Sequence, residues 1–357
     1  MLGSVSLFGA AASSGINAVV TGDVAVNFDD NVTLAKKKTS DTWFNFAPGI
    51  SVESDRQNSF SANYAWNQFS SHSKLNTGLL GLDGNFGFDD GKGALLGKLA
   101  YHETAQNTVD TRLADKLVRK DESTVGLKSK FSPSPLGRVE ASFSYVDSKY
   151  KDVAFNSNKI WEVPVEAYYE YSPKLALGGG YRYRSTDLAR GTTNSKDNYL
   201  YFAADGEFAP SLRGKVTVGF NERKPERGAK DSGLGFEAQL SYEVTPKSRV
   251  TGTLSNDYGV AGTGTNQRNL NFRLGGDSEV ESTWTVGASA AYRQMTYLTT
   301  TGGNDDYYEL EAHVAKKWTD TIKTRAGLTH RFLRAGGVRS AGNFDNTVFA
   351  VAASVRF

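Results

Sequence analysis

Apolar and polar residues alternate with a period of two along most of the chain. Every second position of the last segment is apolar: Phe349, Val351, Ala353, Val355 and Phe357. Such alternation is typical of a β-strand with one apolar face, whereas the 3.6-residue period of helices is almost absent. The pattern predicts an all-β protein, although a soluble β-sandwich also has alternating strands.

The alternating segments are long. Soluble strands average about 5–6 residues, whereas a tilted strand that crosses a membrane needs about 9–11 residues. A β-propeller, which would also repeat about every 40 residues, has shorter strands and a recurring blade motif that this sequence lacks. We therefore expect a transmembrane antiparallel up-and-down β-barrel of about 18 strands. The expected strands are 16–28, 43–54, 59–70, 76–88, 93–104, 122–132, 137–148, 158–172, 175–186, 197–208, 212–223, 233–245, 248–258, 268–277, 283–296, 307–318, 322–333 and 346–357.

The expected connections alternate in length. Short turns such as 173–174 and 246–247 join one end of the strands, and long polar loops such as 105–121 and 187–196 join the other. Outer-membrane barrels have short periplasmic turns and longer extracellular loops. The alternation therefore predicts a barrel in the bacterial outer membrane, with both ends of residues 16–357 on the periplasmic side.

The first 15 residues lie outside this pattern. Residues 1–14 contain an apolar run that ends in small residues, with no Lys or Arg in front of it. This composition fits the remnant of a secretory signal, a disordered N-terminus or a vector-supplied start. We therefore expect one domain, the barrel of residues 16–357, with residues 1–15 outside it.

The composition excludes several other classes. Hydrophobic residues make up 39% of the chain, mean hydropathy is −0.45, and no run of 18 apolar residues occurs, which excludes a bundle of membrane-spanning helices. A net charge of +2 gives no electrostatic footprint for nucleic acid. Because the chain has no cysteine and four histidines, we expect no disulfide, no metal site and no cofactor. His102, His313 and His330 lack a matching serine or acid constellation, so we expect no enzymatic activity.

The tryptophans fall at two heights along the expected strands. Trp66 and Trp161 lie on the apolar face near the long-loop ends, and Trp284 and Trp318 lie on that face near the short turns. This placement predicts two interfacial aromatic girdles. Trp43 has a suitable height, but its register points inward.

Two short motifs resemble those of known outer-membrane proteins. Phe357, preceded by alternating apolar residues, is similar to the carboxy-terminal signal that the barrel-assembly machinery recognises. Residues 28–32 (Phe-Asp-Asp-Asn-Val), followed by 46–52 (Phe-Ala-Pro-Gly-Ile-Ser-Val), resemble the β-barrel porin 2 family. The resemblance implies a role in exporting an exopolysaccharide, with periplasmic polysaccharide-export components as partners. As an outer-membrane protein, the chain would also contact membrane lipid and lipopolysaccharide.

The inward positions of the expected strands carry most of the strand charge. Opposite charges on neighbouring strands can pair, each pair contributing about 0.2–1 kcal/mol. The ladders either brace and hydrate the wall or create a transverse field that selects solutes. The expected lumen-lining residues are Arg138, Glu140, Glu162, Glu166, Glu170, Arg182, Arg184, Asp205, Arg213, Lys215, Glu237, Arg273, Arg293, Glu309, Glu311, Lys323, Arg325 and Arg331.

These features predict an outer-membrane channel with a polar, charge-lined lumen. The family resemblance implies that an extracellular polysaccharide passes outward. The alternatives are a general or small-solute diffusion porin and a closed structural barrel whose loops bind partners. Loop 105–121 has an amphipathic pattern (Val109, Leu113 and Leu117 beside charged residues), so we expect a short helix there, and an inward fold of this loop would favour gating or closure.

Overall fold

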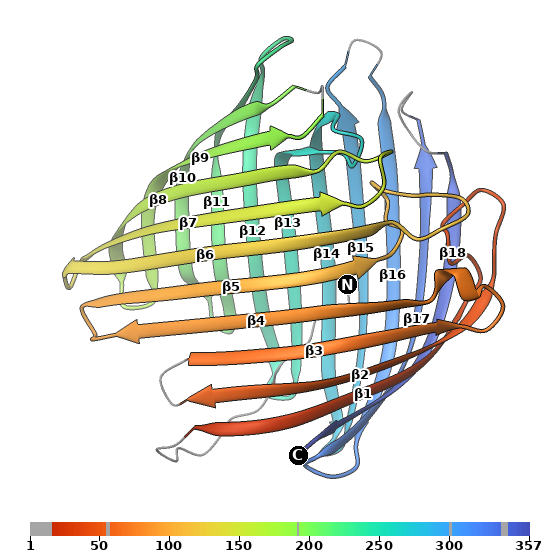
Figure 1. Cartoon of the computed structure of the whole chain (residues 1–357). Helices are drawn as coiled ribbons and strands as arrows, with labels where there is room; N and C mark the ends of the chain where they lie inside the picture. The colour runs from red at the N-terminus through yellow and green to blue at the C-terminus, as the bar shows by residue number, and fades with distance from the viewer. Residues whose placement is uncertain (1–15, 55–57, 191–192, 300–301, 337–341) are drawn as a thin grey trace.

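The computed structural model describes residues 16–54, 58–190, 193–299, 302–336 and 342–357, so the segment 1–15 lies outside the described residues. Within the described part, 18 strands of 12–16 residues form one sheet (Figure 1). The strands are β1 (Asn17–Asp29), β2 (Asp41–Ser54), β3 (Asn58–Phe69), β4 (Thr77–Asp89), β5 (Gly93–Ala105), β6 (Arg119–Ser134), β7 (Gly137–Tyr150), β8 (Asn158–Ser172), β9 (Leu175–Leu188), β10 (Ser195–Ala209), β11 (Leu212–Pro225), β12 (Asp231–Thr245), β13 (Ser248–Val260), β14 (Asn266–Glu281), β15 (Trp284–Tyr297), β16 (Asn304–Lys317), β17 (Ile322–Ala335) and β18 (Phe344–Arg356).

The sheet closes into a barrel because β1 pairs with both β2 and β18. The closing register runs from Thr21↔Arg356 to Asp29↔Val348. Every other strand pairs antiparallel with its neighbours in sequence, so the topology is up-and-down throughout. The predicted closed, antiparallel, 18-stranded barrel is confirmed. Closure removes both sheet edges and satisfies the backbone groups of the strands internally.

The connections differ at the two ends of the barrel. Two-residue turns at 210–211 and 246–247 join β10 to β11 and β12 to β13, and a shift in strand register precedes each turn. Ser211 adopts a left-handed conformation (φ 65°) that the first of these tight turns requires. At the other end, the connection between β5 and β6 spans residues 106–118. Phe357 and Val20 exchange backbone hydrogen bonds at the short-turn end, where both described ends of the chain lie.

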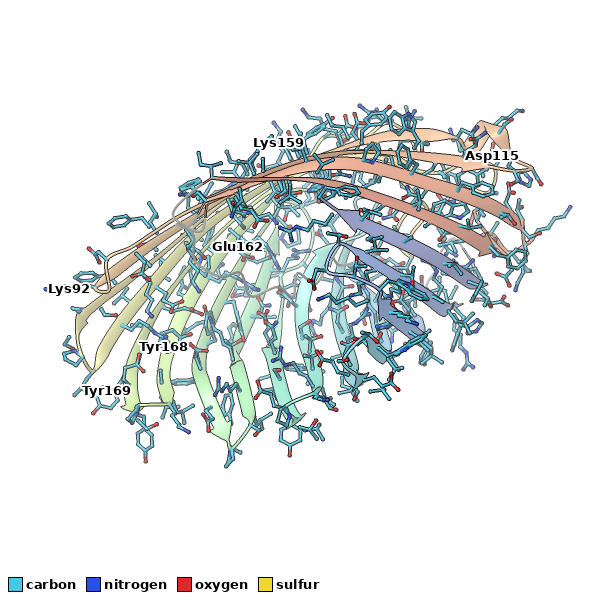
Figure 2. The ribbon with its side chains drawn as sticks, turned by 90° about the horizontal axis from the view of Figure 1, so that it is seen from below. Lys92, Asp115, Lys159, Glu162, Tyr168 and Tyr169 are labelled. Carbon is cyan, nitrogen blue, oxygen red and sulfur yellow. The ribbon has the colours of Figure 1, made fainter. Side chains whose placement is uncertain are left out.

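The outer face of the barrel is apolar. Large hydrophobic side chains are exposed at alternate positions of the strands, including Val165 and Tyr169 on β8 and Phe202 on β10, which is 78% exposed. Their neighbours Glu166 and Tyr168 are buried, and Tyr168 points inward where Tyr169 points outward (Figure 2). Because successive side chains of a strand point to opposite faces, one sequence pattern serves an apolar exterior and a polar interior.

The interior at the loop end of the barrel is closely packed. Leu34, Met295, Leu333 and Phe344 form a buried cluster, with Val109 packed against it. These residues come from the β1–β2 connection, the β5–β6 connection and three strands, so loops and wall pack together at this mouth. Polar residues are buried beside them, and Asn31, Gln267 and Asn346 are among the fully buried side chains.

The connection 106–118 contains no helix, so the short helix predicted within 105–121 is wrong. Its backbone is held by the side chain of Asn107, whose Nδ2 donates to the carbonyl oxygens of Leu113 (2.9 Å) and Lys116 (3.2 Å). Its Oδ1 accepts from the backbone N–H of Val118 (3.1 Å). An asparagine that bonds the local backbone in this way competes with helical hydrogen bonding. No helix in the described part of the chain is long and apolar enough to cross a membrane.

Candidate functional site

The predicted lumen-lining residues occupy strand positions that face the inside of the barrel. Glu162 of β8, for example, lies inside the ribbon, whereas Tyr169 of the same strand projects outward (Figure 2). The structure brings many of these side chains together in three networks of ion pairs and hydrogen bonds, which lie on different parts of the wall.

The first network surrounds Glu166 on β8. Lys215 Nζ donates to both of its carboxylate oxygens (2.6 and 2.7 Å), and the hydroxyls of Tyr201 (2.7 Å) and Tyr168 (3.2 Å) donate as well. These four donated bonds satisfy a carboxylate that is only 8% exposed. The geometry therefore makes Glu166 a cross-brace between β8, β10 and β11.

Arg138 organises the short-turn side of the same network. Its Nη2 lies 2.7 Å from Asp205 Oδ2, and its Nε lies 3.4 Å from Glu140 Oε1 and 3.6 Å from Glu170 Oε1. One guanidinium thus faces three carboxylates, which come from β7, β8 and β10. The predicted residues Arg138, Glu140, Glu170 and Asp205 therefore meet at one point of the wall.

The second network lies nearer the loop end, across β8 to β13. Arg184 contacts Asp197 (Nε–Oδ2, 2.7 Å) and Asp257 (Nη1–Oδ2, 2.9 Å), and Arg182 contacts Asp257 (Nη2–Oδ1, 2.8 Å). Glu162 lies 3.6 Å from the nearest nitrogen of each arginine. Sequence reasoning missed Asp197 and Asp257, although both occupy the same inward phase of their strands as Asp205 and Ser255.

The third network lies on β14 to β17. Arg273 contacts Glu309 (Nη1–Oε1, 3.3 Å) and Glu311 (Nη2–Oε2, 3.5 Å), and Arg325 contacts Glu311 (Nη2–Oε1, 2.6 Å). Arg331 Nε donates to Asn346 Oδ1 (2.7 Å). Both glutamates therefore form ion pairs with neighbouring arginines. They are not a pair of unpartnered carboxylates of the kind that acid–base catalysis uses.

A patch of tyrosines lies flat against the inner wall. Tyr168, Tyr199 and Tyr201 form a buried cluster, with the rings of Tyr199 and Tyr201 stacked at 4.5 Å. Glycines make room for them, because a Cβ at Gly178 would lie 2.9 Å from Tyr168 Cδ1 and one at Gly180 would lie 2.7 Å from Tyr201 Cζ. The glycines at 178 and 180 therefore relieve crowding against the aromatic rings.

Guanidinium groups cover this tyrosine patch on the lumen side. Arg138 Cζ lies 4.4 Å from the ring centroid of Tyr168, and Arg182 Cζ lies 5.0 Å from that of Tyr199. Cation–π contacts of this kind stabilise both partners where water is partly excluded. The patch therefore presents charge, and not bare aromatic faces, to the lumen.

A recess of about 380 Å³ opens in the wall at the second network. Glu162, Arg182, Asn221 and Glu237 are among its lining residues. Asn221 Nδ2 donates to Asp257 Oδ1 (2.7 Å), while its buried Oδ1 has no hydrogen-bond partner within the described part of the chain. Such a recess suits a small polar solute that donates hydrogen bonds.

A few of the predicted lumen charges lie outside the networks. Among the described residues, Glu237 on β12 and Lys323 on β17 have no ion-pair partner. Arg213 lies 3.8 Å from Glu207, and its side chain is 69% exposed. These side chains leave a residual charge on the inner face of the barrel.

The inner face of β2 to β4 is largely uncharged. Asn45 Nδ2 donates to Asn67 Oδ1 (2.8 Å), Asn67 Nδ2 donates to Thr77 Oγ1 (3.2 Å), and Asn85 Nδ2 donates to a neighbouring serine (3.1 Å). These amides and hydroxyls can exchange hydrogen bonds with a neutral polar solute. The lumen thus has an amide-rich wall and a charged wall.

The connection 106–118, here called the mouth loop, extends across the loop end of the barrel. Arg293 on β15 binds Asp110 of the loop (Nη1–Oδ2, 2.8 Å). Asn107 Nδ2 donates to the carbonyl oxygen of Thr33 (2.7 Å), and Arg112 Nη2 donates to that of Gly342 (2.9 Å). The mouth loop therefore contacts β15, the β1–β2 connection and the segment before β18, and it narrows this mouth.

Arg112 of the mouth loop is partly enclosed by its neighbours. Its Cζ lies 4.6 Å from the ring centroid of Phe344, and its Nη1 donates to the carbonyl oxygen of Leu34 (3.3 Å). Burial lowers the pKa of Arg112 from its usual value. Sequence reasoning missed Asn107, Asp110 and Arg112 as individual residues, because their partners lie far away in the chain.

The predicted girdle residues project from the outer face at two heights. Trp66 stacks on Phe46 (5.8 Å between centroids) at the loop end, and Trp161 contacts a tyrosine at 5.0 Å. At the turn end, the Lys316 ammonium lies 4.8 Å from the Trp284 ring centroid and 3.8 Å from that of Trp318. Trp43 packs inside the barrel on Phe69 (5.6 Å), as its register indicates.

Comparison with solved structures gives the same architecture. The outer-membrane protein OpdK of Pseudomonas aeruginosa matches with a TM-score of 0.50 and 11% identity, over 96% of this chain and 99% of that chain. OpdO of the same organism matches with a TM-score of 0.50 and 10% identity, over 96% and 97% of the two chains. OccK9 (OpdG), also from that organism, has a TM-score of 0.50, 11% identity and coverage of 96% and 99%.

The chain is an outer-membrane β-barrel. The closed 18-stranded sheet, its apolar exterior and the similarity in fold to these solved outer-membrane proteins agree on this point. No family model matches the sequence, and no curated protein matches it. Within the described part of this outer-membrane barrel, no group of three or more histidine, aspartate or glutamate side chains is arranged to hold a metal ion.

Proposed function

We propose that the protein is a passive outer-membrane channel for small polar solutes. The observation that carries the proposal is the inner wall, which combines ion-pair networks, an amide-rich face and a recess of about 380 Å³ inside a closed 18-stranded barrel. A barrel of this strand number is wide enough to hold an aqueous channel unless loops fill it. The mouth loop restricts the opening, which favours small solutes over large ones.

The mouth loop limits the size of the solutes that can enter, and the polar groups of the inner wall determine which solutes can bind there. OpdK, whose fold is similar, has been crystallised with vanillate, a small organic acid. We do not transfer that solute to this chain, because the two sequences are 11% identical and the likeness is one of fold alone. In this chain, Glu237 on β12 and Lys323 on β17 have no ion-pair partner among the described residues. A solute with several hydroxyl or amide groups would use both the amide-rich face and the charged face.

The second candidate is outward passage of an extracellular polysaccharide, for which the family resemblance provides the argument. The amide-rich inner face of β2 to β4 is compatible with a neutral sugar chain, because amides and hydroxyls exchange hydrogen bonds with sugar hydroxyls. An extended chain would have to displace the mouth loop from its contacts with β15 and the β1–β2 connection.

Liposome swelling and planar-bilayer recordings with the purified barrel separate these alternatives. A small-solute channel conducts ions and admits mono- and disaccharides at rates that fall steeply with size. A polysaccharide channel admits longer oligosaccharides once the mouth loop is shortened. A closed structural barrel gives neither swelling nor conductance, and this result would overturn the proposal.

A further inference from the structure

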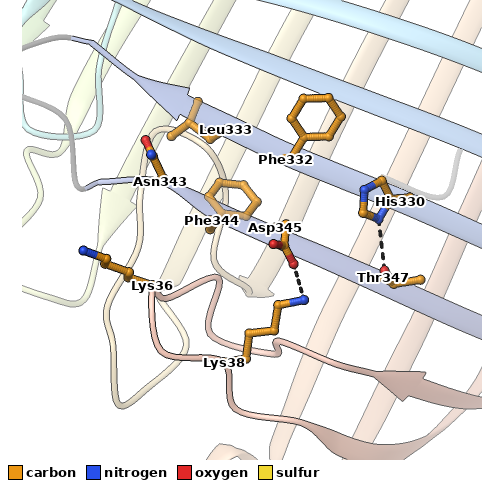
Figure 3. Close-up of a pocket in the computed structure, with 9 residues that line it drawn as sticks. All are labelled: Lys36, Lys38, His330, Phe332, Leu333, Asn343, Phe344, Asp345 and Thr347. Carbon is orange, nitrogen blue, oxygen red and sulfur yellow. Dashed lines mark hydrogen bonds and ion pairs between the residues drawn. The ribbon is translucent and has the colours of Figure 1, made fainter.

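A second recess lies on the outside of the barrel at its loop end, between the β1–β2 connection and strands β17 and β18 (Figure 3). It has a volume of about 560 Å³ and is lined by Lys36, Lys38, His330, Phe332 and Asp345, among others. His330 Nδ1 lies 3.0 Å from Thr347 Oγ1. Both side chains alternate with Arg331 and Asn346, which face inward, so this pair lies on the outer face.

The β1–β2 connection is fixed over this recess by its own acidic residues. Lys38 Nζ lies 2.9 Å from Asp30 Oδ2 and also pairs with Asp345 (Figure 3). The two carboxylates raise the pKa of Lys38 above its usual value. Asp30 Oδ1 also accepts from the backbone N–H of Thr347 (2.6 Å), so the connection is tied to β18 from both directions.

The anchoring leaves an excess of positive charge at the rim. Lys36 and Lys37 are exposed and have no ion-pair partner among the described residues. Arg334 on β17 is also exposed, and its Cζ lies 5.9 Å from the ring centroid of Phe332. Lys36 lines the recess, Lys37 lies between the lining residues Lys36 and Lys38, and Arg334 contacts the ring of the lining residue Phe332. Lys38 itself is paired with two carboxylates.

Below these cations, the outer face becomes aromatic and then aliphatic. Tyr292, Tyr308 and Phe332 form a continuous row of rings across β15 to β17, with centroid distances of 5.1 Å (tilted) and 4.7 Å (stacked). Further along the same face, Leu310 and Leu328 are exposed. Cations, aromatic rings and aliphatic side chains thus follow one another from the rim towards the middle of the barrel.

We infer that this recess binds a phosphorylated glycolipid of the outer leaflet. Its phosphate groups would meet Lys36, Lys37 and Arg334, its sugar ring would lie on Phe332 and His330, and its acyl chains would follow the aliphatic face. Basic clusters next to the membrane surface attract anionic lipid headgroups, and aromatic rings prefer the interface. A free phosphate would use only the cations, so the apolar part of the face favours the lipid. The inference is independent of whether the lumen conducts.

The test measures binding of bis-phosphorylated lipid A to the full-length barrel in detergent by native mass spectrometry. Lys36→Gln/Lys37→Gln should weaken binding by about tenfold or more, because two charges near an anionic headgroup are lost. Arg334→Gln should weaken it in the same direction. Lys92→Gln/Lys247→Gln is the matched control, since it removes the same charge from exposed turns at the opposite end and should leave binding unchanged.

Two further arms identify the ligand. Lipid A without phosphates should bind at least tenfold more weakly than the phosphorylated lipid. Inorganic phosphate at millimolar concentration should fail to displace the lipid. Equal losses in the Lys36/Lys37 variant and in the control would overturn the site. Equal binding of the dephosphorylated lipid would overturn the role of the cations, and displacement by inorganic phosphate would overturn the glycolipid as the ligand.

Discussion

Replacing Asp110 by Asn should release the mouth loop from the barrel wall. The carboxylate of Asp110 binds Arg293 through two contacts, Nη1–Oδ2 at 2.8 Å and Nη2–Oδ1 at 3.4 Å. The side chains of Arg293 and Asp110 are 25% and 22% exposed, so water reaches the pair only in part. The amide keeps the size of the side chain but removes its charge, and one of its two polar atoms can no longer accept a hydrogen bond.

The structure sets the magnitude of this effect. Hydrogen bonds to charged groups contribute about 1.5–3 kcal/mol when shielded from water, whereas exposed ion pairs contribute about 0–1 kcal/mol. A pair that is about a quarter exposed lies between these limits, at roughly 1–2 kcal/mol. Since 1.4 kcal/mol corresponds to a factor of ten, the ratio of released to attached loop should rise about 5–30-fold. The Asn107 and Arg112 contacts remain, so the loop should fluctuate and not leave permanently.

Single-channel recording in planar bilayers measures this ratio as the time spent in the higher-conductance state. Arg293→Gln should act in the same direction, and the double variant should add little to either single change, because both remove one interaction. Arg273→Gln is the control, because it removes a lumen arginine that binds Glu309 and Glu311 and not the mouth loop. Unchanged gating in both the Asp110 and Arg293 variants would refute the role of this pair.

Four further outcomes test the rest of the structure. Replacing Glu162, Glu166 and Glu170 by Gln should shift ion selectivity towards anions, partly because Lys215 loses its partner. Replacing Arg182 and Arg184 by Gln should shift it towards cations. Reversal potentials in a salt gradient measure both shifts, and unchanged values would show that these residues do not select ions. Removing Phe357 should lower the outer-membrane yield in cells more than the stability of the folded barrel, and an unchanged yield would argue against an assembly signal. Val163→Arg, on the lipid face, should reduce the free energy of unfolding in bilayers by about 2–4 kcal/mol, whereas Ser142→Arg, on the lumen face, should cost less; equal losses would contradict the assignment of faces. A membrane-impermeant maleimide should label Glu226→Cys on intact cells but not Ser211→Cys, and the reverse result would invert the topology.

The fold could be predicted from the sequence because the two faces of each strand meet different surroundings, membrane lipid outside and the polar lumen inside. Val165 meets lipid and Glu166 meets the lumen, and this contrast repeats along the strands, so a one-residue error in register would place charges in the membrane. Turn-forming residues also indicate where strands end, as in the short Pro-Lys connections at 173–174 and 246–247. The predicted strand boundaries consequently agree with the observed ones to within a few residues for most strands.

The mouth loop could not be predicted in the same way. Val109 and Leu113 have helical spacing, but Val109 packs against the cluster of Leu34, Met295, Leu333 and Phe344, whose members lie far away in the sequence. Asp110 binds Arg293, which lies 183 positions further along the chain. The hydrophobic period of a segment reflects contacts along that one segment. The conformation of this loop depends on partners on the opposite wall, so its own sequence does not reveal it.

Partner choice inside the lumen was predictable only for adjacent strands. Glu309 and Glu311 lie on β16 and the predicted lumen cations Lys323, Arg325 and Arg331 lie on the adjacent strand β17, where Arg325 binds Glu311. Arg184 on β9, however, reaches Asp257 on β13, across three intervening strands. Long arginine side chains span such distances when the barrel wall curves, and curvature is a property of the closed sheet that the strand pattern does not contain.

The same networks decide between the two roles that the sequence leaves open for the charged ladders. A charge whose counter-ion lies within 3 Å produces little field a Debye length away, about 8 Å at physiological salt, because the pair acts as a dipole. Glu166 with Lys215 and Arg184 with Asp197 are pairs of this kind, so their main effect is to brace the wall. Glu237, Lys323 and Arg213 lack such close partners among the described residues, and their fields therefore extend into the water. Solute selection should consequently depend more on these few side chains than on the more numerous paired ones, and Glu237→Gln alone should move the reversal potential further than Glu166→Gln.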